Sequence, residues 1–168
     1  MAAPTKRRSF EPGHHRKFLV IADESKEVES ALLFAAGRVQ RSGGQIKLLY
    51  VIEPDAQFWG GVRQLQIDEE TNKAKALFRL FRRKLTNEGF DGVVCEETIL
   101  EGKRVDMIGQ EIERDEDIAI LVLGAAEDAK GPGPLISALV AGSTAGKFPI
   151  PITIVPGGLS TDAIKSMA

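Results

Sequence analysis

The chain has 168 residues, 43% of them hydrophobic and 27% charged, with a formal net charge of −2. This length and composition fit one globular domain and exclude wholesale disorder, and a lone cysteine, Cys95, excludes a disulfide-stapled scaffold. No apolar run is long enough to span a bilayer, and the first 17 residues lack the apolar core of a signal peptide. The sequence therefore predicts a cytoplasmic protein without a membrane partner.

Charge is unevenly distributed along the chain. Residues 1–17 contain five basic residues and one acidic residue, so the acidic excess belongs to the rest of the chain. With Pro4, Pro12 and Gly13 and no apolar periodicity, residues 1–16 predict a flexible basic arm. A mildly acidic body offers no electrostatic footprint for DNA or RNA, so no nucleic-acid partner is expected.

Short apolar runs alternate with amphipathic segments through the rest of the chain. Continuous runs such as 18–22 and 118–123 are typical of strands buried on both faces of a parallel sheet, whereas apolar residues at helical spacing predict helices. In chain order, the predicted elements are strand 18–22, helix 26–41, strand 46–52, helix 68–87, strand 93–100, a helix after Gly102, strand 118–123, helix 135–147 and strand 151–156. Prolines flank the last strand, which predicts an edge position in the sheet.

These elements predict an α/β fold, a single doubly wound parallel sheet of five strands with helices on both faces. The predicted domain covers residues 17–157, between the arm at 1–16 and a small, polar C-terminal tail at 158–168. Such sheets bind ligands beyond the carboxyl ends of the strands, where the strand order reverses. The loops after the first, second and fourth strands therefore form the candidate site.

Residues 55–67 predict a loop that is long for a compact domain and that contains Phe58 and Trp59. Exposed aromatic side chains are frequent anchors of protein interfaces, so the loop predicts a surface for a protein partner. The alternative is that both rings pack onto the sheet.

Asp23 directly follows the first strand and is the strongest single candidate for a binding residue. At that position a carboxylate can accept hydrogen bonds from a ribose hydroxyl or an adenine amine. It can equally cap the helix that follows, and the sequence leaves both roles open.

Glycines form a second candidate cluster. Gly124, Gly131 and Gly133 lie between the fourth strand and its helix, and the segment Gly142-Ser143-Thr144 lies further along. Glycines let the main chain approach a phosphate closely, and the hydroxyls of Ser143 and Thr144 can add hydrogen bonds. Alternatively, the glycines only shape a loop and the hydroxyls bond helix carbonyls.

The spacing of other motifs argues against several common sites. In residues 142–147 the glycines are too close for a P-loop, and Phe148 stands where a P-loop has Ser or Thr. Gly131-Pro132-Gly133 lacks the third glycine of a dinucleotide site. The two histidines, His14 and His15, lie in the predicted arm, away from any acidic or cysteine cluster. No metal site and no enzyme beyond a weak ATPase is expected.

Four segments together resemble the universal stress protein family. The resemblance is carried by 18–25 (a strand ending in Asp, with Ser two positions on), 48–54 (the second strand), 122–124 (a strand closed by Gly), and 139–143 followed by 149–152 (the last helix and strand). It spans about residues 16–157, nearly the whole predicted domain.

This resemblance implies a Rossmann-like sheet of order 3-2-1-4-5 and a homodimer paired through the last strand. It also implies a binding role in stress response, with ATP or AMP as the ligand in some members and magnesium accompanying ATP. Carried over by position, it places Ala22 and Asp23 at the nucleoside, Val51 at the adenine, and Gly124 and Gly142-Ser143 at the phosphates.

The chain departs from the family pattern in its phosphate loop. The loop is about five residues longer, and Pro132 stands at the place of the second glycine, between Gly131 and Gly133. It also carries Glu127 and Asp128, whose charges would repel a phosphate. The alternative prediction is therefore an interaction protein of the same family that binds no nucleotide.

Overall fold

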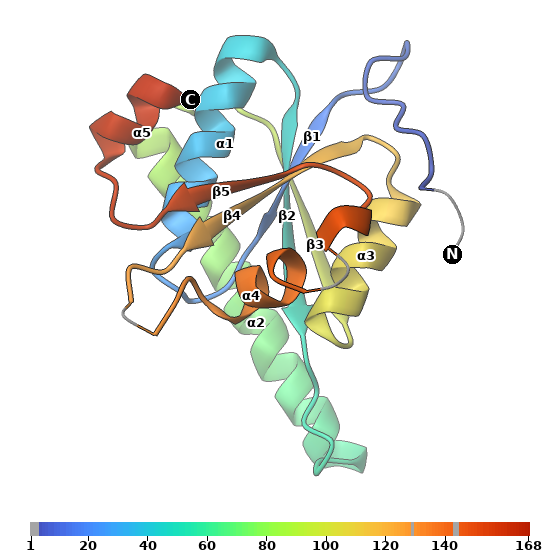
Figure 1. Cartoon of the computed structure of the whole chain (residues 1–168). Helices are drawn as coiled ribbons and strands as arrows, with labels where there is room; N and C mark the ends of the chain where they lie inside the picture. Colours follow the sequence, from blue (N-terminus) through green and yellow to red (C-terminus); the bar gives the residue numbers. More distant parts are fainter. Residues whose placement is uncertain (1–3, 129, 143–144) are drawn as a thin grey trace.

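The computed structural model describes residues 4–128, 130–142 and 145–168 (Figure 1). Its elements are β1 (Lys17–Ile21), α1 (Val28–Ser42), β2 (Gln45–Ile52), α2 (Gly60–Asn87), β3 (Cys95–Glu101), α3 (Arg104–Arg114), β4 (Ile118–Ala125), α4 (Pro134–Val140), η1 (Ala145–Lys147), β5 (Ile152–Pro156) and α5 (Thr161–Met167). The strands pair in parallel in the order β3-β2-β1-β4-β5. The predicted α/β fold, the implied strand order and the edge position of β5 are confirmed.

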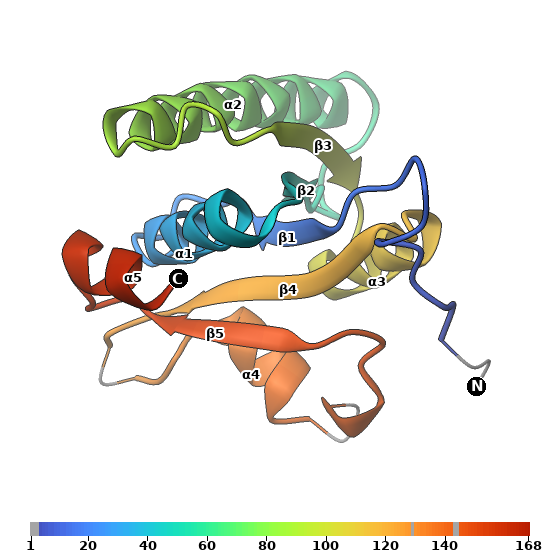
Figure 2. The same cartoon turned by 90° about the horizontal axis from the view of Figure 1, so that it is seen from above.

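Helices cover both faces of the sheet, so the inner strands supply side chains to two core layers (Figure 2). In β1, Phe18 and Val20 pack with α1, α2 and α5, whereas Leu19 and Ile21 pack with α3 and α4. Successive strand residues point to opposite faces, so a strand between two helical layers is apolar at every position. This explains the continuous apolar runs of the sequence.

Helix α2 begins at Gly60, so the predicted loop over 55–67 is wrong beyond Trp59. Its amino-terminal end projects past the sheet (Figure 1), and its buried residues begin only at Ala74. A projecting segment buries no apolar stripe, so its sequence lacks the periodicity by which helices are recognised. The exposed apolar side chains at this end, here called the α2 patch, are Phe58, Trp59, Val62 and Leu65.

Within the part of the chain that the structure describes, no helix is both long and apolar enough to cross a membrane.

Helix α4 is shorter than the predicted helix over 135–147, because it ends at Val140 and the short 3-10 helix η1 covers 145–147. Gly142 and Gly146 interrupt this segment. Glycine costs about 1 kcal/mol relative to alanine in a helix interior, which disfavours one continuous helix here.

The N-terminal segment packs against the connection between α3 and β4, although the sequence predicted a flexible arm. The Arg7 guanidinium donates hydrogen bonds to the carbonyl oxygens of Ile112 (2.5 Å) and Asp115 (3.2 Å) at the C-terminal end of α3. His14 Nδ1 lies 2.6 Å from Asp117 Oδ1. Cations are favourable at a helix C-terminus, where carbonyls lack helical partners.

The C-terminal segment forms helix α5, where the sequence predicted a polar tail. The Ser160 hydroxyl accepts a hydrogen bond from the Ala163 N–H and caps its start. Ile164 and Ala168 are buried against the domain. Gly37 of α1 makes room for this end of the chain, since a Cβ there would stand 2.5 Å from the Ala168 Cβ.

Candidate functional site

A crevice lies beyond the carboxyl ends of β1, β2 and β4, where the sheet order switches from β1 to β4. It consists of two adjoining cavities that share Arg104, Pro134 and Leu135 in their walls. The inner cavity, of about 140 Å³, lies between the β1–α1 and β4–α4 connections. The outer cavity, of about 590 Å³, lies beside the end of β2. Doubly wound sheets bind ligands at this place.

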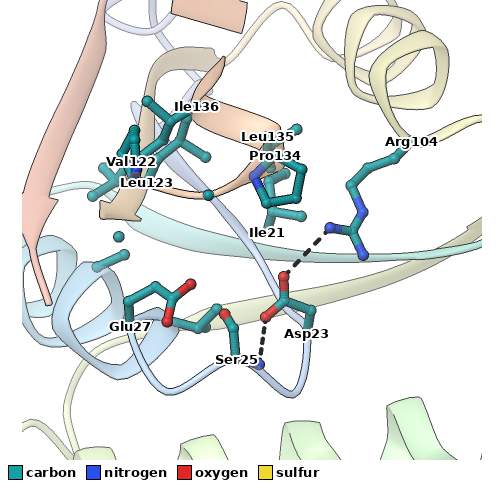
Figure 3. A pocket seen from close by; sticks show the side chains of 15 residues that line it. Ile21, Asp23, Ser25, Glu27, Arg104, Val122, Leu123, Pro134, Leu135 and Ile136 are labelled. Carbon is teal, nitrogen blue, oxygen red and sulfur yellow. Dashed lines mark hydrogen bonds and ion pairs between the residues drawn. The ribbon is translucent and has the colours of Figure 1, made fainter. Parts of the chain in front are cut away.

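Asp23 uses its two carboxylate oxygens differently (Figure 3). Oδ1 accepts a hydrogen bond of 2.7 Å from the Ser25 N–H and closes the turn before α1. Oδ2 faces the crevice and lies 3.5 Å from an Arg104 guanidinium nitrogen. The predicted capping of the following helix is wrong, because α1 begins at Val28 with Glu27 as its N-cap and without a side-chain cap hydrogen bond. Asp23 instead closes the turn before the helix and presents its second oxygen to the crevice.

Arg104 is a site residue that the sequence analysis missed. It is the first residue of α3, and its main-chain N–H donates a 2.9 Å hydrogen bond to Glu53 Oε1 after β2. A cation at a helix N-terminus is electrostatically unfavourable. A basic residue directly after Gly102 and Lys103, at the predicted start of a helix, was therefore the sequence feature that could have indicated a functional role for Arg104. The guanidinium stands where the two cavities meet.

The outer cavity has a polar wall that the sequence analysis also missed. The Tyr50 hydroxyl donates a 2.6 Å hydrogen bond to Glu70 Oε2 of α2. Burial, together with this bond to a carboxylate, raises the pKa of Tyr50 far above its usual value. The phenol therefore stays neutral and remains a hydrogen-bond donor. Val51 and Leu135 supply apolar surface to the same cavity.

The long loop after β4 is folded back on itself. The Ala126 N–H donates to the Pro132 carbonyl, and the Gly131 N–H to the Asp128 carbonyl, both at 3.0 Å. These bonds turn residues 127, 128, 130 and 131 away from the inner cavity, so that Gly124 and Gly133 both line it while Gly131 does not. The described residues of the extra loop length thus lie outside the crevice.

The acidic residues of this loop also lie elsewhere than predicted. The Glu127 carboxylate lies over Gly158, where a Cβ would stand 2.7 Å from it. The Asp128 carboxylate accepts a hydrogen bond from the Lys130 N–H. Neither residue lines the inner or the outer cavity. Besides Asp23, the described acid that lines the inner cavity is Glu27, at the start of α1.

The structure brings together only part of the predicted site. Asp23, Gly124 and Gly133 line the inner cavity, and Val51 lines the outer cavity. Outside both cavities, Ala22 is buried with its N–H donating to the Leu49 carbonyl, Gly131 lies in the outward turn, and Gly142 is exposed. Ser143 and Thr144 lie outside the described residues. Within residues 4–128, 130–142 and 145–168, no group of three or more His, Cys, Asp or Glu side chains could hold a metal ion.

Solved structures with the same fold come from bacteria, archaea and plants. The universal stress protein UspA from Lactobacillus plantarum is 20% identical, with 83% of this chain and 97% of that chain covered and a TM-score of 0.68. The universal stress protein from Archaeoglobus fulgidus in complex with dAMP is 19% identical, covers 84% and 98%, and has a TM-score of 0.56. A universal stress protein family protein from Arabidopsis thaliana with AMP bound is 18% identical, covers 84% and 91%, and has a TM-score of 0.52.

Sequence comparison identifies the family directly. No curated protein sequence matches the chain significantly. A sequence model of the universal stress protein family, however, matches residues 14–156, from the end of the N-terminal segment to the last residue of β5. The chain therefore belongs to the universal stress protein family.

Proposed function

We propose that this chain binds an adenine nucleotide in the crevice and acts as a binding module rather than as an enzyme. The position of Asp23 carries the proposal, because its Oδ2 faces the crevice at the switch point of the sheet while Oδ1 is held by Ser25. The dAMP and AMP complexes of proteins with this fold support an adenine nucleotide as the ligand.

Each part of the nucleotide has a matching surface. The outer cavity has room for a base, and Val51 and Leu135 offer apolar contacts to a planar ring. Asp23 lines the inner cavity beside Arg104, at which the two cavities meet, and its carboxylate can accept hydrogen bonds from ribose hydroxyls. The inner cavity, between Gly124 and Gly133, is then left for the 5′ side of the ribose.

Magnesium would accompany ATP only. The homodimer through β5 and the cytoplasmic location stay predictions.

Replacing Asp23 with asparagine is expected to weaken AMP binding about 10- to 100-fold, since hydrogen bonds to a charged group contribute about 1.5–3 kcal/mol. Asparagine keeps an acceptor for the Ser25 N–H, so the turn before α1 is retained. Titration calorimetry with AMP measures the effect, and Asp91→Asn, an exposed change before β3, is the matched control.

Nucleotide that co-purifies with the wild-type protein gives an independent test, after denaturation and chromatography of the supernatant. Equal AMP affinity for Asp23→Asn and the wild type would contradict the assigned role of Asp23. The absence of both co-purified nucleotide and measurable AMP or ATP binding would contradict the proposed function.

A nucleotide-free interaction protein is the second candidate, and the α2 patch favours it. Trp59 is 82% exposed and Leu65 63% exposed, which is unusual for large apolar side chains on a monomer. Failure to bind any adenine nucleotide, with this patch still exposed, would favour this second function.

A further inference from the structure

The inner cavity contains a carboxylate beside the two glycines of the β4–α4 connection. Glu27 points into the cavity from the start of α1 (Figure 3), and its Oε1 lies 4.0 Å from where a Cβ of residue 133 would stand. The Glu27 main chain approaches Gly124 more closely still, since a Cβ at position 124 would stand 2.0 Å from the Glu27 carbonyl oxygen. A group bound between the two glycines would therefore lie next to this carboxylate.

The charged side chains around the whole crevice are mostly acidic. Among the described side chains that line the two cavities, the acids are Asp23, Glu27, Glu53 and Glu70, and the base is Arg104. The Arg104 guanidinium already lies 3.5 Å from Asp23. Described ion pairs in the inner cavity do not include Glu27, so its charge acts directly on whatever enters there.

We propose that this crevice selects adenine ligands with few phosphate charges, adenosine or AMP, against ATP, and that Glu27 determines this selection. The inference rests on the proposed function, in which the base occupies the outer cavity and the 5′ side enters the inner one. Each further phosphate adds negative charge close to the Glu27 carboxylate, where partial burial weakens solvent screening. The β- and γ-phosphates of ATP therefore meet repulsion that adenosine does not meet.

The experiment compares dissociation constants of adenosine, AMP and ATP-magnesium by titration calorimetry for three proteins. These are the wild type, Glu27→Gln, and the matched control Glu29→Gln, which alters an exposed acid two residues further along that does not line the crevice. We expect the wild type to bind ATP at least tenfold more weakly than AMP. Glu27→Gln should strengthen ATP binding about tenfold while changing adenosine binding less than threefold, and Glu29→Gln should match the wild type.

Salt provides a second readout, because screening reduces repulsion between charges. Raising sodium chloride from 0.1 to about 0.5 M should reduce the difference between the dissociation constants of AMP and ATP more in the wild type than in Glu27→Gln. Circular dichroism melting checks that both variants fold, and Glu27→Ser provides a second neutral substitution.

The outcomes separate this inference from the proposed function. If wild-type protein binds ATP as tightly as AMP, or if Glu27→Gln leaves their ratio unchanged, charge selection is wrong while nucleotide binding stands. If neither wild type nor Glu27→Gln binds adenosine, AMP or ATP, the proposed function is itself overturned, and the inference with it.

Discussion

Replacing Lys47 with methionine is expected to lower the free energy of unfolding by about 3–5 kcal/mol. Lys47 lies on β2, and its side chain is 3% exposed. Its ammonium forms an ion pair with Glu111, which is 1% exposed, and lies 2.8 Å from Asp115 Oδ2. Methionine preserves the packing of the aliphatic stem but leaves Glu111 with Arg114, whose side chain is 65% exposed. Removing the ammonium takes away the buried cation of the pair, so the buried Glu111 carboxylate keeps only a partner at the surface.

Urea unfolding followed by circular dichroism at pH 7 measures this loss. Lys73→Met is the matched control, because Lys73 pairs with Glu24 and Glu70 at the surface, where ion pairs contribute little. The double variant Lys47→Met/Glu111→Gln should recover part of the stability, since it also removes the buried Glu111 charge. A Lys47→Met midpoint no lower than that of Lys73→Met would show that the cluster is not stabilising.

The same cluster is expected to make stability fall steeply between about pH 4 and pH 2. Burial raises the pKa of Asp115, but hydrogen bonds from Lys17 and Lys47 outweigh it and lower the pKa to about 2. A depressed carboxyl pKa contributes stability above the unfolded value of about 3.9, and that stability is lost as pH falls through the folded value. Urea midpoints across this range should therefore decline less in Asp115→Asn than in the wild type, and equal slopes would contradict the prediction.

Gly124→Ala is expected to destabilise the fold by about 1–3 kcal/mol and to abolish nucleotide binding. A Cβ on β4 at this position would stand 2.0 Å from the carbonyl oxygen of Glu27 and 2.6 Å from its carbonyl carbon. These are main-chain atoms, so the start of α1 must move away from the sheet. Because Asp23 and Glu27 both belong to the β1–α1 region, the inner cavity would change shape with it.

The control for this variant is Gly109→Ala in α3, where an added Cβ meets nothing within 4 Å. Alanine is a better helix former than glycine by about 1 kcal/mol, so this change should leave stability equal or higher. Urea unfolding and AMP titration of both variants measure the difference. A Gly124→Ala protein as stable as Gly109→Ala, with AMP affinity intact, would mean that α1 does not depend on this close approach.

Gly124 shows that a glycine expected at a ligand site can also have a structural reason. The resemblance implied that Gly124 lies at the phosphates of a nucleotide. In the fold it lines the inner cavity, and its missing side chain also allows the main chain of Glu27 to cross β4. In the sequence, a glycine needed for close packing of a helix start on a strand looks the same as a glycine needed at a phosphate. The sequence alone therefore cannot distinguish these two reasons for Gly124.

The start of α2 and the whole of α5 were not predicted from the sequence. The buried turns of α2, from Ala74 on, have an apolar stripe and were predicted. Its exposed first turns carry Val62 and Leu65 without an opposing core, so the same periodicity was absent. Helix α5 was missed for a related reason, because seven residues with one strongly buried side chain, Ile164, give too short a pattern.

The sequence by itself determined the α/β class, the five strands, the edge position of β5 and the place of Asp23 directly after the first strand, at the ligand-binding edge of the sheet. These follow from local signals: apolar runs, turn residues and an acid at the end of a strand. Only the tertiary structure decided that Arg104 faces Asp23, that Glu27 rather than Glu127 enters the crevice, and that Arg7 binds the end of α3. Such contacts join residues far apart in the chain, and they depend on strand order and on the direction of each side chain, which no local pattern specifies.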